Sequence, residues 1–181
     1  MQLNAVMKFT PFRILALGAA VAMTSSASAS SGPDHEIDNV LVIAKSSNKN
    51  EVHYAVHVDE ACAPIAPAPI SAYWRMLERG PDVTEPLRSR EERVLGVERQ
   101  LVDTGGVRAT LRAFPGRTLT FHTWRAKDGK CGSAVEMLVA GVPATVASVF
   151  VQQKLFGVAY VELTARTAQG VVVRERLVPA S

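Results

Sequence analysis

Apolar and polar side chains alternate with a period of two along most of this chain, and this alternation restricts the fold more than any other feature. Between Val52 and Asp59, for example, valines and a tyrosine alternate with His53, Ala55 and His57. A period of two places successive side chains on opposite faces of a β-strand. The chain is therefore expected to be mostly β, with the face that carries His53 and His57 open to solvent.

The alternating segments are short, rich in β-branched and aromatic residues, and separated by turn signals such as Thr104-Gly105-Gly106 and Lys127-Asp128-Gly129. The expected strands cover residues 37–44, 52–58, 94–102, 107–113, 118–126, 134–139, 145–153, 158–165 and 171–178. Such short connections favour antiparallel pairing, because parallel crossovers need longer ones. The predicted fold class is all-β, mostly antiparallel, as either a β-barrel or a two-sheet sandwich. A barrel of this size can hold a small ligand.

One short α-helix is expected near residues 85–93. Thr84 is a suitable cap, and Pro86 fits a first turn, where its missing N–H costs nothing. Arg88, Arg90 and Arg93 would form a solvated basic face; a phosphate clamp is the alternative interpretation.

The N-terminal segment has the pattern of a secretory signal peptide. Lys8 and Arg13 precede an apolar run at residues 14–23, and the small-residue exit Ala27-Ser28-Ala29 follows. A bilayer span takes about 20 apolar residues, so a membrane anchor is disfavoured. We expect cleavage after residue 29, a loose lead-in at residues 30–36, a single β-rich domain at residues 37–181, and a periplasmic or extracellular location. Either Met1 or Met7 could be the start.

Removing residues 1–29 lowers the net charge. The whole chain has 20 basic and 17 acidic residues, and the removed part holds Lys8, Arg13 and no acidic residue. The mature chain then has 18 basic and 17 acidic residues, a net charge of +1. A near-neutral domain lacks the basic footprint of nucleic-acid binding, so no nucleic-acid partner is expected, and no transmembrane segment is expected in the mature chain.

Cys62 and Cys131 are the two cysteines of the chain. An even count in an exported protein predicts one disulfide between them. A redox or nucleophilic thiol is the alternative, although neither cysteine lies in a Cys-x-x-Cys pair.

The histidines give no metal-binding pattern. His53 and His57 would share one face of a strand but lie about 13 Å apart along it, too far for one zinc ion. His122 could approach from another strand, although nothing in the spacing demands it. No metal and no cofactor are expected, and the residues Asn48-Lys49-Asn50 before this strand are typical of a hairpin turn.

Three stretches together resemble a known bacterial family. They are Lys45–Tyr54 with its Asn-x-Asn turn, the segment Pro69-Ile70-Ser71-Ala72-Tyr73-Trp74, and the basic helix leading to Leu95-Gly96. Their order is similar to that in the domain of unknown function 4833 (DUF4833) family, in which an aromatic residue stands at the position of Leu95. The resemblance implies an uncharacterised, often exported domain, and it supplies no reaction, cofactor or catalytic residue.

Tyr73, Trp74 and Arg75 are the predicted ligand contacts, because an extended segment would point Tyr73 and Trp74 to opposite sides and leave one of them for a pocket. No catalytic residue is assigned, since no serine lies in a nucleophile motif. The leading hypothesis is a non-enzymatic binding module for a small apolar or amphiphilic ligand in a barrel mouth or inter-sheet cleft. The alternatives are a domain that docks an envelope protein and a hydrolase with dispersed residues, with His53 or His122 as general base.

Overall fold

The computed structural model describes residues 35–155 and 157–178, all of which belong to one compact unit of the chain, Ser31–Ser181. The predicted signal peptide, most of the predicted lead-in and the two candidate start sites lie outside the described residues. His35 and Glu36, which were expected in the lead-in, already form the start of the first strand.

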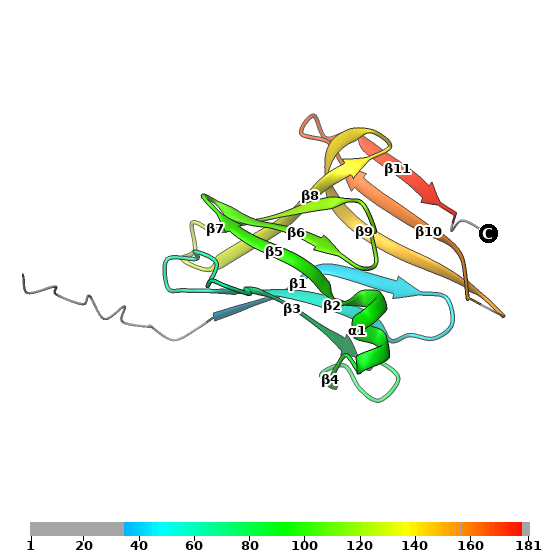
Figure 1. Ribbon diagram of the computed structural model, residues 1–181. Coiled ribbons are helices and arrows are strands. Elements are labelled where there is room, and N and C mark those ends of the chain that lie inside the picture. Colours follow the sequence, from blue (N-terminus) through cyan, green and yellow to red (C-terminus); the bar gives the residue numbers. More distant parts are fainter. Residues whose placement is uncertain (1–34, 156, 179–181) are drawn as a thin grey trace, which may run out of the picture. The chain divides into compact units, whose positions relative to one another are not determined.

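The described chain is mostly β, as predicted, with one helix (Figure 1). The elements are β1 (His35–Lys45), β2 (Glu51–Val58), β3 (Ile70–Arg75), β4 (Thr84–Pro86), α1 (Ser89–Leu95), β5 (Val97–Asp103), β6 (Gly106–Leu111), β7 (Thr118–Arg125), β8 (Cys131–Val139), β9 (Val142–Lys154), β10 (Gly157–Arg166) and β11 (Val172–Leu177). Every predicted strand is present with shifted ends, and β3 and β4 come in addition.

Strand β9 organises the sheet. The strand order is β4-β3-β2-β1-β9-β8-β7-β6-β5, and β10 and β11 extend from β9. One edge of β9 pairs with β10. Along the other edge, residues 142–145 pair with β8 and residues 149–151 pair with β1. The short β1–β9 contact is parallel, whereas the other strand pairs are antiparallel. Because β8 and β1 share one edge of β9, the two arms of the sheet can face each other.

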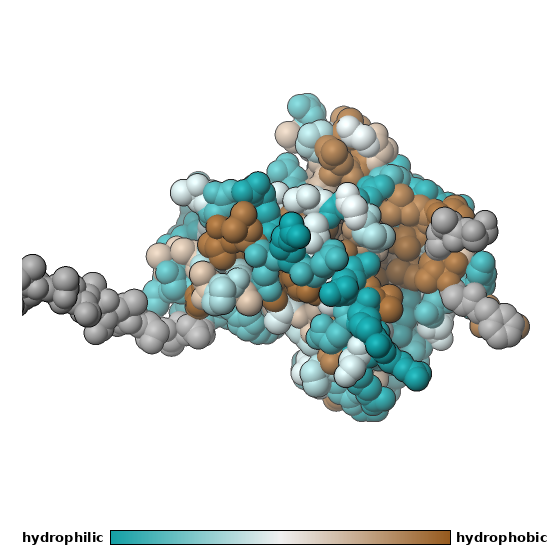
Figure 2. All heavy atoms as spheres, viewed as in Figure 1, coloured by the Kyte–Doolittle hydropathy of each residue, from teal (hydrophilic) through white to brown (hydrophobic). Residues whose placement is uncertain are grey.

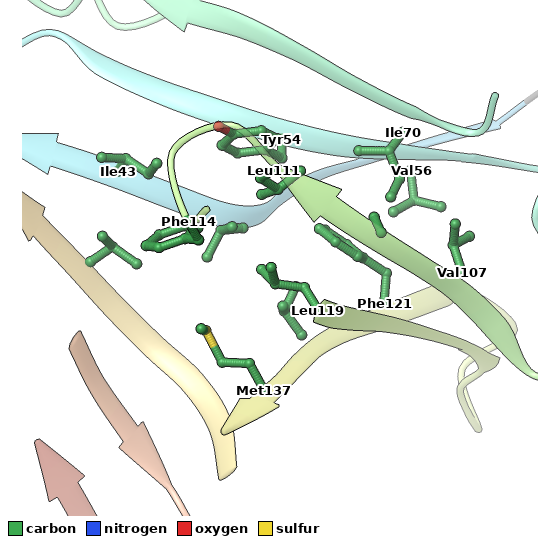
Figure 3. Close-up of a cluster of buried hydrophobic side chains, with 14 of the residues drawn as sticks. Ile43, Tyr54, Val56, Ile70, Val107, Leu111, Phe114, Leu119, Phe121 and Met137 are labelled. Atoms are coloured by element: carbon green, nitrogen blue, oxygen red, sulfur yellow. The ribbon is translucent and has the colours of Figure 1, made fainter. Parts of the chain in front are cut away.

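The core fills the space between these two arms (Figure 3). Tyr54 and Val56 point inward from β2, and Leu111 and Phe121 point inward from β6 and β7. All four are fully buried, with 0% exposure. Tyr54 also donates a hydrogen bond from its hydroxyl to the carbonyl of Leu95, which ties the end of α1 to the core. The interior is therefore occupied by side chains.

The sheet does not close into a barrel, so of the two predicted architectures the barrel is wrong. Where β3 and β5 approach each other, no strand pairing joins them within the described residues. Instead the Gln100 side chain accepts from the Ile70 N–H at 2.8 Å and donates to the Ile70 carbonyl at 3.3 Å. A single side chain thus satisfies the backbone groups that strand pairing would use in a closed barrel.

The helix lies later than predicted, at Ser89–Leu95, and the expected N-terminal part is strand β4. Thr84–Pro86 pairs with Tyr73–Arg75 of β3 and so gains backbone partners that a first helical turn would lack. The Glu91 carboxylate then accepts from the Arg88 N–H at 2.7 Å and marks the true start of the helix.

The predicted Cys62–Cys131 disulfide is present. It joins the loop after β2 to the first residue of β8, and it therefore links the two facing arms of the sheet. Most of the surface over α1 is hydrophilic, although Val94 of this helix is 60% exposed, and apolar side chains are also visible over β9 and β10 (Figure 2).

An ion pair ties β11 to the start of β7. Arg117 donates to both carboxylate oxygens of Glu175, at 2.6 and 2.9 Å, and the Ala140 N–H donates to the same carboxylate at 2.9 Å. The bond from Arg117 holds the pKa of Glu175 below its ordinary value of 4.5. Because the folded-state pKa is lowered, the pair stabilises the fold above that ordinary pKa and loses its effect as the pH falls through the folded pKa.

We expect Glu175→Gln to lower the free energy of unfolding by about 1 kcal/mol near pH 7, the upper end for a partly exposed pair. The difference from wild type should shrink as the pH falls below 4.5. Urea unfolding at about pH 7 and about pH 3 measures both values. Glu162→Gln, which breaks the more exposed Glu162–Arg176 pair on the same arm, is the control and should cost only a few tenths of a kcal/mol. An equal cost of Glu175→Gln at both pH values would contradict the assignment.

Candidate functional site

Strand β3 carries the three predicted ligand contacts and divides them between its two faces. Trp74 packs against the core on the inner face, whereas the Tyr73 ring lies 5.8 Å from that of His53 on the outer face. Arg75 reaches the outer face too, where it donates to Asn39 at 3.4 Å. The expectation that Tyr73 and Trp74 point to opposite sides is thus correct. Tyr73 and Arg75 share a surface, and Trp74 belongs to another.

Trp74 lines a pocket of about 220 Å³ where β3 and β4 meet α1. Its walls come from the end of β1, the β1–β2 turn, β3, the β3–β4 turn, β4 and the start of α1. The lining residues are Lys45, Asn48, Asn50, Trp74, Met76, Arg79, Glu85, Arg88 and Glu91. The volume corresponds to about seven water molecules and is below the roughly 300 Å³ of typical drug-sized sites.

Two nitrogen donors at this pocket have no acceptor in the described part of the chain. Trp74 Nε1 is buried and has no hydrogen-bond partner within the described residues. Lys45 Nζ lies 4.1 Å above the centre of the Trp74 ring and makes no ion pair among the described side chains. Partial burial lowers the pKa of Lys45, and nearby Glu91 and Glu78 partly offset this effect. A buried N–H without a partner is costly, so an acceptor in this pocket would relieve that cost.

The carboxylates of the pocket are already engaged. Glu85 pairs with Arg79, and Glu91 accepts from the backbone N–H of Arg88. The lining side chains nevertheless include three cationic groups, Lys45, Arg79 and Arg88, against the two carboxylates, so the charge of the lining sums to a positive value. Together with the apolar surfaces of Trp74 and Met76, this arrangement favours a small ligand that has an anionic group and an apolar part.

The Asn-x-Asn turn builds one wall of the pocket, and β1 and β2 pair as the predicted hairpin on either side of it. Asn50 is buried, at 6% exposure, and its N–H donates to the Asn48 side chain at 3.1 Å. The Asn50 side chain accepts from the Glu78 N–H at 3.2 Å and donates to the Glu78 carboxylate at 3.3 Å. These bonds fix the turn to the β3–β4 connection and hold the pocket open on that side.

On the outer face, a bulge in β1 covers β2. The pairing skips from Ile37–Val56 to Leu41–Tyr54, so three residues of β1 oppose Ala55. Asn39, with a φ of 60°, hydrogen-bonds to His53, and the other ring nitrogen of His53 lies 2.9 Å from Glu51. His53 is only 4% exposed, so the prediction of a solvent-open face is wrong at this position.

The same bulge engages Tyr73. Its hydroxyl donates to Asp38 at 2.9 Å, and burial together with this bond raises the pKa of Tyr73. Arg75 donates to the Pro81 carbonyl at 2.8 Å. Both side chains make polar contacts with the protein itself, and of the three predicted contacts Trp74 is the one that lines the pocket.

The histidines do not form a catalytic relay in the described part of the chain. The Nε2 atom of His57 lies 3.2 Å from Ser71 Oγ and 3.3 Å from Glu36, so one nitrogen faces both groups. A relay needs the hydroxyl and the acid on different nitrogens. His122 contacts Glu136 at 3.1 Å on an open surface. Both ring nitrogens of His53 are occupied, as described above.

Residues 35–155 and 157–178 contain no group of three or more His, Cys, Asp or Glu side chains arranged to hold a metal ion. In the same residues, no helix is long and apolar enough to cross a membrane.

The fold and the pocket define a class of protein: a disulfide-linked, open β-sheet whose two arms enclose the core, with a small pocket where β3 and β4 meet α1. The model of the DUF4833 family matches residues 41–176, and the chain belongs to this family. No curated protein and no solved structure matches the chain.

Most of the pocket was not predicted from the sequence. Trp74 was predicted as a ligand contact, whereas Lys45, Met76, Arg79 and Glu85 were not. Lys45, Asn48 and Asn50 belong to one stretch that carries the family resemblance, and Trp74 belongs to another. The joint occurrence of these two stretches was the signal that could have placed the four residues in one site. Arg88 was noted as part of a basic helix face, and the structure instead places it at the pocket.

Proposed function

We propose that this protein is a non-enzymatic binding module whose site is the Trp74 pocket. Its ligand is a small amphiphile with an anionic group, such as a short-chain carboxylate. The observation that carries the proposal is the buried Trp74 Nε1 without a partner beside the unpaired Lys45. A carboxylate oxygen would accept from both donors, while the short chain would contact Met76 and the indole ring.

The pocket replaces the barrel mouth or inter-sheet cleft as the location of the site. Side chains such as Tyr54, Phe114 and Phe121 occupy the interior of the described chain, which argues against a ligand there. We further propose that the protein acts in the periplasm or outside the cell. The Cys62–Cys131 disulfide supports this location, because disulfides persist in oxidising compartments.

The test uses hexanoate as the probe and its neutral relative hexanamide as the matched ligand control. Two indole N–H signals, from Trp74 and Trp124, are expected in a ¹H–¹⁵N NMR spectrum of the oxidised protein. Hexanoate should shift the Trp74 signal saturably, and hexanamide should bind more weakly. If hexanoate leaves the Trp74 signal in place, or moves both indole signals alike, the proposal is wrong.

Lys45→Met removes the charge and keeps an unbranched side chain that is one atom shorter. It should weaken hexanoate binding about tenfold or more, because a hydrogen bond to a charged group contributes roughly 1.5–3 kcal/mol. Lys49→Met is the matched control, since Lys49 is exposed in the same turn and does not line the pocket. Equal weakening by the two variants would point to a general loss of positive charge and contradict the site.

A further inference from the structure

A second surface with the character of a binding site lies on the outer face of β7 and β8, away from the Trp74 pocket. Leu119 and Phe121 of β7 are fully buried, at 0% exposure, so the alternate residues of this strand face outward. Those residues are Thr118, Thr120, His122 and Trp124. Trp124 is 46% exposed, an unusual exposure for the largest side chain of a folded domain.

Trp124 packs against its cross-strand neighbour Gly132. A Cβ atom at Gly132 would lie 2.7, 2.8 and 2.9 Å from three atoms of the indole ring. The three atoms, Nε1, Cε2 and Cζ2, follow one another along one edge of the indole, so this edge of the ring lies against the glycine. The side chain as a whole is 46% exposed, so part of the ring remains open to solvent. The glycine is needed for this arrangement, since any side chain at position 132 would displace the ring.

The same outer face continues from Trp124 into a cleft of about 620 Å³. Thr120 pairs across the strands with Glu136, and both residues line the cleft. The cleft residues are Gly116, Arg117, Thr118, Thr120, Glu136, Met137, Leu138, Gly141, Pro143 and Glu175. From Trp124 to Thr118 the strand rises by about 20 Å. Trp124 and the cleft therefore form one extended surface along β7 and β8, which we call the track.

The polar and charged side chains along this track contact one another. His122 Nε2 lies 3.1 Å from Glu136, and Arg117 is held by both oxygens of Glu175. A nucleic-acid strand would need an excess of positive charge, which these pairs do not offer. A peptide added as a strand would need a free sheet edge, whereas this track lies on a sheet face.

We propose that the outer face of β7 and β8 binds a neutral, extended oligosaccharide. One sugar ring stacks its C–H face on the exposed part of the Trp124 ring, and the following rings donate and accept hydrogen bonds with Thr120, Glu136 and Thr118 in the cleft. An exposed aromatic ring, hydroxyls and the Arg117–Glu175 ion pair suit a ligand that is rich in hydroxyl groups and carries no net charge. This site is independent of the Trp74 pocket, and either can exist without the other.

The test is a titration with two neutral β-1,4-linked tetrasaccharides, cellotetraose and tetra-N-acetylchitotetraose, followed on the indole signals of the oxidised protein. At least one of them should shift the Trp124 signal saturably and leave the Trp74 signal in place. Trp124→Phe assigns the signals, and Trp74→Phe should leave oligosaccharide binding unchanged.

Gly132→Ala is the sharpest variant, because it keeps Trp124 but forces its ring off the backbone. We expect binding to weaken at least about tenfold, in line with the contribution of one stacked ring. Thr120→Val, which removes a hydroxyl with little change in shape, should weaken binding severalfold. It provides the test if Gly132→Ala does not fold. The proposal is overturned if neither tetrasaccharide moves the Trp124 signal, or if binding is the same in wild type, Gly132→Ala and Thr120→Val.

Discussion

Replacing Cys62 and Cys131 together by alanine is expected to lower the free energy of unfolding by about 4 kcal/mol. The two cysteines are 69 residues apart in sequence, and the disulfide removes the conformational freedom of that loop from the unfolded chain. The closed loop contains β3 to β7, which includes most of one facing arm of the sheet. A domain of this kind typically has a total stability of 5–15 kcal/mol, so the loss would be a large fraction of it.

Urea unfolding followed by circular dichroism, with the proteins kept under oxidising conditions, measures the change. Wild type treated with a reductant should unfold at nearly the same urea concentration as the double variant, and the double variant should not respond to the reductant. A loss below about 1 kcal/mol would show that the link restricts the unfolded chain far less than its loop length implies.

Phe121→Ala should lower the free energy of unfolding by about 3–5 kcal/mol. Phe121 has no exposed surface and projects from β7 into the core between the facing arms (Figure 3). Removing its ring leaves a cavity that the rigid pairing of β7 with β6 and β8 prevents from collapsing fully. Thermal and urea unfolding of the oxidised protein measure the loss.

Phe150→Ala is the matched control, because Phe150 lies in β9 but is 36% exposed. Phe150→Ala should lower the free energy of unfolding much less, because the Phe150 side chain buries less apolar surface in the folded protein. If the two variants cost the same, the core does not lie between the facing arms of the sheet as described.

Local patterns in the sequence were enough to predict the elements of the fold. The alternation at Val52, Tyr54 and Val56 depends only on which face of a strand each side chain occupies, and the structure confirms these residues as core. The Asn48-Lys49-Asn50 turn and the Cys62–Cys131 disulfide are likewise as predicted. Of the three predicted ligand contacts, the structure places Trp74 at the candidate pocket, whereas Tyr73 and Arg75 lie on the other face of β3 and contact residues 38–39 and the β3–β4 turn.

The tertiary structure decided everything that depends on contacts between distant segments. The sequence by itself determined a β-rich, disulfide-linked chain with one helix, because strand period, turn residues and cysteine count are local properties. It could not show that β9 pairs with both β8 and β1, that residues 38–40 bulge over His53, or that Thr84–Pro86 joins β3 as a strand. Backbone hydrogen-bonding groups are identical at every residue, so the choice of pairing partner is made only when the whole chain is packed. That packing also placed Lys45 over Trp74 and thereby formed the pocket.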